Sequence, residues 1–280
     1  MTHRLGKRIG VFTSKTLLFV VALCTCAPCI AVELTKATVD AFDRYIAATE
    51  AKLEPRFRGD HFLWADESPE WRQRLRRGTL IVQPTEPTSI IAIRGGLIQD
   101  WVGAVFIPDA SLRSTLSVVQ DYGHHREIYK PEIADAKILS RAGDDFQVYM
   151  RIVKAKLLLS DVLNTEHEIR FTAVDSHRVF SRASSRRIAE VSNAGKPGEH
   201  ELAVGQDRGF LWRIYGYWFF EESDGGVYVT CQSITLTRDL PFALGTVLGP
   251  ILRELPGDSL RNSLEQTKKA VIAISRTTVP

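Results

Sequence analysis

Cysteine is scarce in this sequence, which has four in 280 residues. Cys24, Cys26 and Cys29 lie close together near the amino terminus, and only Cys231 lies in the body of the chain. If the amino-terminal segment is removed, a single cysteine remains, which excludes an internal disulfide. None of the first three cysteines follows the residues of a lipoprotein cleavage box, so we expect no lipid anchor.

An excess of basic residues is also missing from the body of the chain. The formal net charge of +3 comes from 36 Lys plus Arg and 33 Asp plus Glu, but residues 1–31 hold four of the basic residues and none of the acidic ones. The rest of the chain therefore has 32 basic against 33 acidic residues, a net charge near −1. This balance gives no support to nucleic-acid binding, which needs many phosphate contacts.

Sequence signatures of common catalytic and metal sites are absent as well. There is no nucleophile elbow, no zinc-ligand spacing and no Gly-rich loop between a strand and a helix. The adjacent His124 and His125 would point in different directions on a helix end, so we interpret them as surface residues rather than as metal ligands. We assign no catalytic residue, no metal and no cofactor.

The amino terminus has the order of a secretory signal peptide. Basic residues precede an apolar run from Leu17 to Leu23, and small residues follow as far as Ala31. The apolar run is shorter than the ~20 residues that a spanning helix needs. We expect cleavage after Ala31, with a retained anchor as the alternative. Either way, the basic residues place the remaining chain outside the cytoplasm, in the periplasm or secreted.

Two regions follow the expected signal peptide 1–31. Residues 32–94 are interpreted as an N-terminal helical extension, with a helix over Leu34–Leu53 and a short second helix that begins at Ser68 and Pro69 and ends before Gly78. Residues 95–280 are interpreted as one ligand-binding domain. It begins with a predicted strand over Leu97–Ile107 and a helix capped by Ser111.

Strands dominate the middle of that domain. Further strands are predicted over Ala136–Ser140, Phe146–Val153, Leu157–Phe171, Val179–Glu190, Gly209–Phe220 and Val227–Leu236. Helical patterns return only from Phe242 to Ile274. Strands grouped together, with helices at the ends, indicate an α+β fold with an antiparallel sheet.

The last two strands form a predicted hairpin around Asp224-Gly225-Gly226. A tight turn there predicts three pairs: Phe220 with Val229, Trp218 with Cys231, and Gly216 with Ser233. The face with Trp212, Ile214, Gly216, Trp218 and Phe220 is expected to be buried, and the face with Arg213, Tyr215, Tyr217 and Glu221 to meet solvent. Gly216 opposite Ser233 leaves room in the buried face, which indicates either a cavity or space that a helix fills.

The order of elements resembles the START-like helix-grip superfamily. The resemblance lies in a strand, an Asp-Ala-Ser turn, a helix ending in the segment Gln120–Pro131, many strands and a long terminal helix, and it covers roughly Leu97–Ile274. That superfamily includes lipid-transfer START domains, polyketide cyclases and coenzyme-Q-binding proteins. The resemblance implies a sheet curved around the C-terminal helix, with a deep cavity between them. It does not identify the ligand, because members of one fold bind different molecules.

Strand alternation gives candidate ligand-binding residues inside this grip. Asp161, Thr165 and His167 share the expected inward face of one strand. Asp161 and Arg187 could pair there or hold a polar head group, because an unpaired buried charge is costly. The full expected set is Asp161, Thr165, His167, Ser181, Arg187, Trp212, Gly216, Trp218, Ser233, Val247 and Ile251.

The C-terminal helical region is expected to break near Gly249-Pro250, because proline lacks the helical N–H donor and glycine lowers stiffness. Asp258 would then cap a second helix that packs on the sheet. The first segment would act either as a mobile gate or as a rigid kink, and the sequence does not distinguish the two.

Three functions are compatible with these patterns. The first is an exported, non-catalytic START-like protein that binds a hydrophobic ligand, a lipid or an isoprenoid, with transient membrane contact as an option. The second is a cyclase-like or hydrolytic enzyme that uses His167 with Asp161 or Arg187 for acid–base chemistry. The third is a protein-interaction module with an exposed aromatic patch of Tyr215, Tyr217 and Phe219.

Overall fold

The computed structural model describes residues 34–59, 61–156, 159–203, 207, 210–239 and 242–277, without the side chains of residues 155–160 and 242–252. The expected signal peptide 1–31 lies outside the described residues. No helix of the described part is long and apolar enough to span a bilayer.

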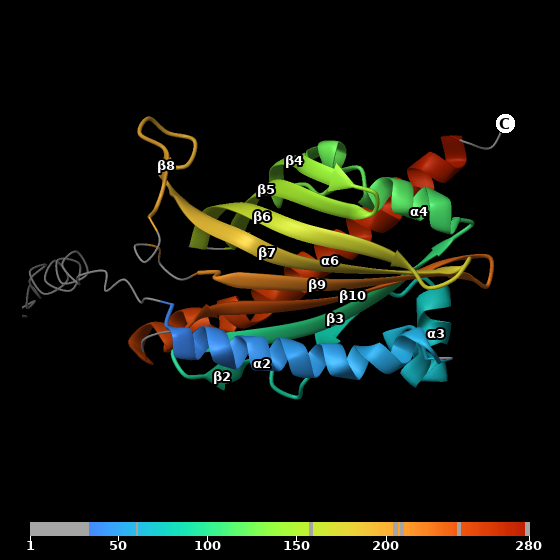
Figure 1. Cartoon of the computed structure of the whole chain (residues 1–280), viewed down its shortest axis with the longest axis horizontal. Coiled ribbons are helices and arrows are strands. Elements are labelled where there is room, and N and C mark those ends of the chain that lie inside the picture. Colours follow the sequence, from blue (N-terminus) through green and yellow to red (C-terminus); the bar gives the residue numbers. More distant parts are fainter. Residues whose placement is uncertain are drawn as a thin grey trace, which may run out of the picture. The chain divides into compact units, whose positions relative to one another are not determined.

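One antiparallel sheet lies at the centre of the described chain (Figure 1). Its strands follow the order β1-β3-β10-β9-β7-β6-β5-β4, while two short strands, β2 and β8, pair with β3 and β7. β-branched and aromatic residues are frequent in these strands because they suit a pleated surface. The bounds are β1 Ile81–Pro84, β2 Ile91–Ile93, β3 Gly96–Pro108, β4 Ile133–Ala142, β5 Asp145–Lys156, β6 Leu159–Ala173, β7 Arg178–Ser192, β8 His200–Glu201, β9 Arg213–Ser223 and β10 Gly226–Arg238.

The hairpin of β9 and β10 has the predicted register. All three predicted pairs are present: Phe220 with Val229, Trp218 with Cys231, and Gly216 with Ser233. The two turn residues between the strands, Asp224 and Gly225, both have positive φ, at 55° and 75°. A two-residue turn of this kind matches the twist of its strands, so the Asp-Gly pair fixes the register locally.

Helices occur before the strands, between β3 and β4, and after the last strand. Thr35 caps α2 and Ser111 caps α4, each accepting a hydrogen bond from a backbone N–H in the first turn. The bounds are α2 Lys36–Leu53, α3 Pro69–Arg76, α4 Leu112–Val119, α5 His125–Ile128 and α6 Phe242–Thr277, with 3-10 turns η2 Glu54–Phe57, η3 Trp64–Glu67 and η4 Tyr122–His124. The predicted helices in residues 32–94 and after Ser111 are therefore confirmed.

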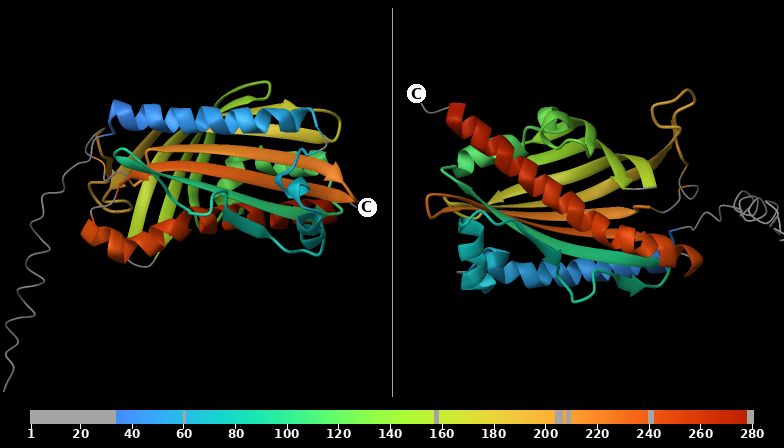
Figure 2. Two further views of the ribbon diagram at one scale, coloured as in Figure 1. Left: turned by 90° about the horizontal axis from the view of Figure 1, so that it is seen from below. Right: turned by 180° about the vertical axis from the view of Figure 1, so that it is seen from behind.

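The two long helices lie on opposite faces of the sheet (Figure 2). α2 runs along the outer face, whereas α6 crosses the concave face diagonally. Each face has its own cluster of buried apolar residues: the outer cluster contains Phe42, Phe62 and Phe219, and the inner one contains Phe220 and Leu264. This sheet curved around a long C-terminal helix is an α+β helix-grip fold, as the sequence predicted.

The expectation that Tyr215, Tyr217 and Glu221 face solvent is wrong. Tyr217 has no exposed surface, Phe219 is buried, and Tyr215 packs edge-on against Phe42 of α2 with ring centroids 5.8 Å apart. Strand alternation showed that these residues share a face, but it could not show that the N-terminal segment covers that face. No exposed patch of these three aromatic residues is therefore available for a protein partner.

Partly buried polar contacts hold the N-terminal segment on the outer face. The Glu50 carboxylate accepts hydrogen bonds from Tyr217 Oη at 2.9 Å and from Arg182 Nε at 2.6 Å. Tyr45 Oη of α2 donates to Asp100 Oδ2 of β3 at 2.9 Å. Residues 32–94 also supply β1 and β2, so this segment belongs to the same compact unit as the rest of the described chain.

The predicted break in the C-terminal helix is wrong. α6 runs as one helix from Phe242 to Thr277 and includes Pro250 and Pro256. An interior proline disfavours a helix by about 3 kcal/mol, but the helix is held by the packing of Leu260, Leu264 and other residues of its second half on the sheet. The expected ligand residues Val247 and Ile251 belong to this helix, and their side chains lie outside the described residues.

A candidate ligand cavity

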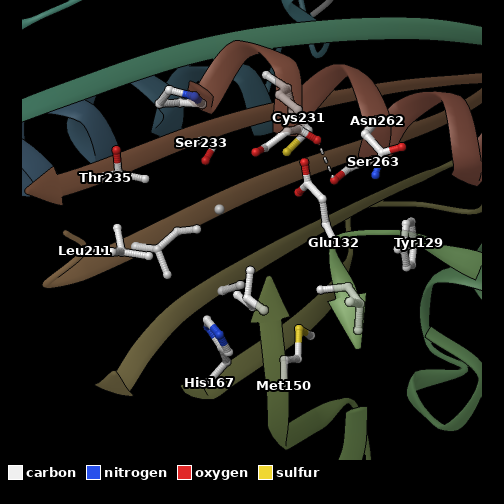
Figure 3. A pocket seen from close by; sticks show the side chains of 18 of the residues that line it. Tyr129, Glu132, Met150, His167, Leu211, Cys231, Ser233, Thr235, Asn262 and Ser263 are labelled. Atoms are coloured by element: carbon white, nitrogen blue, oxygen red, sulfur yellow. Dashed lines mark hydrogen bonds between the residues drawn. The ribbon is translucent and has the colours of Figure 1, made fainter. Parts of the chain in front are cut away.

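A cavity of about 430 Å³ lies between the concave face of the sheet and α6 (Figure 3). Strands β3, β5, β6, β7, β9 and β10 form one wall, and the middle of α6, from Leu255 to Ser263, forms the opposite wall. The volume is in the lower part of the roughly 300–1,000 Å³ that small-molecule sites occupy. A cavity of this size suits one acyl chain or one fused-ring molecule better than a lipid with two long chains.

The absence of a side chain at Gly216 opens the middle of the cavity, as the hairpin pattern indicated. The nearest atoms to a Cβ placed on Gly216 would be Trp218 Nε1 at 3.7 Å and Ala183 Cβ at 3.8 Å. The neighbouring positions that line the cavity, Ser181 and Ser233, are also small. These small residues keep the concave face from closing on α6.

Apolar side chains form most of the remaining wall. Trp218 and Phe220 stack with ring centroids 6.0 Å apart and an interplanar angle of 9°. Met150, Ile169 and Leu260 line the same space. A ligand in this cavity would be held mainly by burial of apolar surface, which is favourable by roughly 25 cal/mol per Å² before the entropy cost of binding.

His167 extends from β6 into the cavity and is almost fully buried. Its Nε2 lies 2.9 Å from Thr165 Oγ1, and Thr165 in turn donates its hydroxyl proton to Met150 O at 2.9 Å. Burial lowers the pKa of His167 to about 4, because the charged ring is poorly solvated there. The imidazole is therefore neutral at physiological pH.

A second buried histidine, His125, also lines the cavity, where the sequence pattern suggested a surface residue. His125 Nε2–H donates to Val119 O at 3.2 Å, and its ring packs between Tyr122 and Tyr129. Desolvation lowers the pKa of His125 to about 4. His124, in contrast, is exposed, and its hydrogen bond with Asp121 raises its pKa. Only His124 fits the surface interpretation.

Charged side chains gather at the side of the cavity where β4 and β5 approach α6. Lys154 Nζ donates to Glu132 Oε2 at 2.8 Å and to Ser259 Oγ of α6 at 2.5 Å. Asp161 is the partner of Lys154 in the β5–β6 pairing and also lines the cavity. Sequence analysis identified Asp161 but missed Glu132 and Lys154, because nothing in their local pattern separates them from surface charges.

Asn262 and Thr235 are further lining residues that are not in the expected ligand-binding set. Thr235 Oγ1 and Asn262 Nδ2 are buried atoms that have no hydrogen-bond partner within the described part of the chain. Asn262 lies on α6, facing the strands in Figure 3. For Asn262, the only signal available in the sequence was a polar residue among apolar residues at helical spacing. Among the described residues, no group of three or more His, Cys, Asp and Glu is placed to hold a metal ion.

The structure brings six of the expected ligand-binding residues to the cavity wall: Asp161, His167, Ser181, Gly216, Trp218 and Ser233. Thr165 lies directly behind this wall and contacts His167. Their role in binding remains a prediction, because their position shows only that they can reach a ligand.

The expectation that Arg187 faces the interior is wrong. Arg187 is exposed and forms an ion pair with Glu201 on the outer side. The β6–β7 pairing contains a bulge, since Glu166 pairs with Arg187 while His167 pairs with Ser185. The extra residue, Arg186, reverses the alternation beyond it, so strict alternation along β7 could not place Arg187 correctly.

The expectation for Trp212 is wrong as well. Trp212 precedes β9 and packs in the outer cluster, with its indole Nε1 donating to Asp207 Oδ1 at 3.1 Å. Its neighbour Leu211 lines the cavity instead. The alternation holds from Ile214 onward but fails where the strand has not yet begun.

No protein-family model matches this chain, and neither does any curated protein. Several solved structures are similar in fold. TTHA0849 of Thermus thermophilus is 15% identical, with 62% of this chain and 97% of that chain covered and a TM-score of 0.44. A STAR-related lipid transfer protein of Xanthomonas axonopodis is also 15% identical, with 64% of this chain and 99% of that chain covered and a TM-score of 0.41. The Zhui aromatase/cyclase of a Streptomyces species is 15% identical, with 65% of this chain and 96% of that chain covered and a TM-score of 0.39.

Proposed function

We propose that this protein is exported and binds one hydrophobic molecule, a lipid or an isoprenoid, in the cavity beneath α6 without catalysing a reaction. The observation that carries the proposal is the cavity of about 430 Å³, whose wall is mostly apolar. A packed core normally fills such space, because an empty apolar void forfeits dispersion contacts. A ligand would restore those contacts.

The proposal is tested by extracting the purified full-length protein with organic solvent and identifying the bound molecules by mass spectrometry. Uptake of the fluorescent apolar probe N-phenyl-1-naphthylamine shows whether the same cavity admits an apolar molecule in solution. We expect Gly216→Phe to abolish uptake, since the new ring would occupy the cavity, and the matched control Gly216→Ala to retain it. No enriched molecule and no probe uptake by the wild-type protein would contradict the proposal.

Cys231 offers an independent readout of occupancy. It is a free, buried cysteine whose thiol lines the cavity, and burial raises its pKa. Its reaction with a small neutral maleimide should be slow and should become slower when the cavity is loaded. An unchanged rate after probe uptake would place the probe elsewhere.

Export is tested by expressing the full-length gene and recovering the protein from outside the cytoplasm. Cleavage after Ala31 predicts that the protein recovered outside the cytoplasm begins at Val32, which intact-mass measurement decides. A mass that includes the first residues would support a retained anchor instead. A transient contact with a membrane is compatible with either outcome.

An acid–base enzyme is the second candidate, because His167 lies inside the cavity together with Asp161. Arg187, the other expected partner, lies on the outside. A histidine with a pKa of about 4 is a weak base at neutral pH, which favours binding over proton transfer. Turnover of a solvent-extracted ligand by wild-type protein, and its loss in His167→Phe, would support the enzyme.

A further inference from the structure

The hydrogen bonds of His167 fix which of its nitrogens can meet a ligand. Thr165 has one hydroxyl proton and donates it to Met150 O at 2.9 Å. Its oxygen must therefore accept the hydrogen bond from His167, so that Nε2 carries the imidazole proton. A neutral imidazole has one proton, which leaves Nδ1 as an acceptor with a lone pair. In the described part of the chain, Nδ1 has no hydrogen-bond partner.

The opposite wall presents the complementary group. Asn262 Oδ1 accepts a hydrogen bond from Gln266 Nε2 at 3.2 Å, which assigns Nδ2 to the other side of the amide. Nδ2 is buried and without a partner among the described residues, although a buried donor without a partner is costly. Figure 3 shows His167 on the strand side and Asn262 on the α6 side of the same cavity. The cavity thus has an acceptor on one wall and a donor on the other.

The charges around the cavity determine what else the ligand can carry. Lys154 is already paired with Glu132, and Asp161 lies across from Lys154 on the neighbouring strand. Arg238, at the end of β10, is the remaining cation of the lining. Within the cavity, the groups without partners, on His167, Asn262 and Thr235, are uncharged. An anionic head group would be drawn to Arg238 at the end of β10, whereas a neutral oxygen-bearing group matches the uncharged groups on His167 and Asn262.

We propose that the ligand is a neutral, oxygen-bearing apolar molecule, with a hydroxyl group that donates to His167 Nδ1 and an oxygen that accepts from Asn262 Nδ2. This inference rests on the proposed function of the cavity as a ligand site. It predicts that plain hydrocarbons and ionised fatty acids bind less tightly than such a molecule. Thr165 acts as a positioning residue, since it fixes the imidazole tautomer without touching the ligand.

The test uses three unbranched compounds with the same number of non-hydrogen atoms: tridecane, 1-methoxyundecane and 1-dodecanol. Each displaces N-phenyl-1-naphthylamine from the full-length protein, and the dissociation constants are compared. The ether adds an acceptor for Asn262, and the alcohol adds a donor for His167. For wild-type protein we expect each step in the series to tighten binding by about 2- to 10-fold, the effect of one net hydrogen bond.

Variants assign each step to its residue. His167→Phe should remove the advantage of the alcohol over the ether and leave that of the ether over the hydrocarbon, and Asn262→Leu should do the reverse. Thr165→Val should lower the advantage of the alcohol in part, because either nitrogen of the ring can then hold the proton. Thr230→Val, which removes a buried polar atom without a described partner from the outer face of the sheet, is the matched control and should change neither step.

Equal affinities for all three compounds in wild-type protein would overturn the inference while leaving the proposed function intact, and this result needs no variant to fold. Tighter binding of dodecanoate than of dodecanol would also overturn it. If the probe itself does not bind, the proposed function fails instead. Circular dichroism of each variant separates loss of a hydrogen bond from loss of the fold.

Discussion

The two faces of the central sheet use adjacent residues of one strand for different purposes. On the outer face, Phe62 of the N-terminal segment packs against Phe219, and the Tyr217 hydroxyl donates to Glu50 of α2. On the concave face, Gly216 and Phe220 border open space. Since alternate residues point to opposite faces, one strand supplies both a filled core and a cavity wall.

This difference separates stability from binding. The outer cluster is closed by packing and by hydrogen bonds to α2, so its residues contribute mainly to the free energy of unfolding. The concave face keeps small residues at its middle and unpaired polar atoms in its wall, which a stability optimum would not retain. Substitutions on the two faces should therefore change different measurements.

The largest expected effect on stability comes from the neighbours Phe219 and Phe220. Phe219→Ala should lower the free energy of unfolding by about 3–5 kcal/mol, since it leaves a void in a filled core. Phe220→Ala should cost less, because its ring already borders the cavity, and it should change the preferred ligand size. Chemical denaturation and probe uptake measure the two effects. Equal losses of stability with unchanged uptake in both variants would contradict the comparison.

The pH dependence of stability should come largely from the cavity face. The pKa values of His125 and His167 are lowered to about 4 in the folded protein, against about 6.5 unfolded. The folded state therefore binds fewer protons between these values, so stability is present above pH ~6.5 and is lost as the pH falls toward ~4. At about pH 5, each histidine should lower the free energy of unfolding by about 2 kcal/mol relative to its value at neutral pH.

Denaturation of wild-type, His125→Phe and His167→Phe proteins between about pH 7 and about pH 5 checks this expectation. Each variant should lose less stability on acidification than the wild-type protein, because it lacks one group that must become protonated on unfolding. The exposed His124 provides the control, and His124→Gln should not flatten the profile in this way.

Two glycines, Gly257 of α6 and Gly216 of β9, show the difference between a tight contact and an open space on the concave side of the sheet. A Cβ on Gly257 would lie 2.5 Å from Trp101 Cζ3, whereas one on Gly216 would have no neighbour closer than 3.7 Å. Gly257→Ala should therefore destabilise the protein by about 1–2 kcal/mol, even after the gain in helix propensity. Gly216→Ala should be close to neutral. A thermal or chemical denaturation series decides, and a stabilised Gly257→Ala would show that α6 can shift freely.

The smallest expected effect concerns a carboxylate on the outer face, with the opposite pH sign to the histidines. Burial raises the pKa of Asp100, although hydrogen bonds from Gln232 and Tyr45 oppose the shift. The contribution of Asp100 to stability is thus greatest at low pH and falls as the pH rises through its raised pKa. Asp100→Asn, which can keep the bond from Tyr45, should become more stable relative to wild type as the pH rises. A constant difference across the pH range would contradict this.

Local patterns were sufficient for several features. The Asp224-Gly225 turn fixes the hairpin register with its own dihedral angles, and Ser111 begins a helix with its own hydroxyl group. The grouping of strands before a long helical region indicated the helix-grip order, and the lack of a side chain at Gly216 indicated space. Each of these depends on residues that are neighbours in sequence or across one tight turn.

Distant contacts decided the rest of the structure. The bulge at Arg186 turns the Arg187 side chain to the outer face of the sheet. α2, which lies far from β9 in sequence, covers Tyr217. The Lys154–Glu132 pair and the unpaired amide nitrogen of Asn262 can be recognised only where β5, β4 and α6 meet. The sequence determined the elements and their order because propensity and turn geometry act over a few residues. Which side chains face the cavity and which are covered depends on contacts between segments far apart in sequence, so only the tertiary structure could decide them.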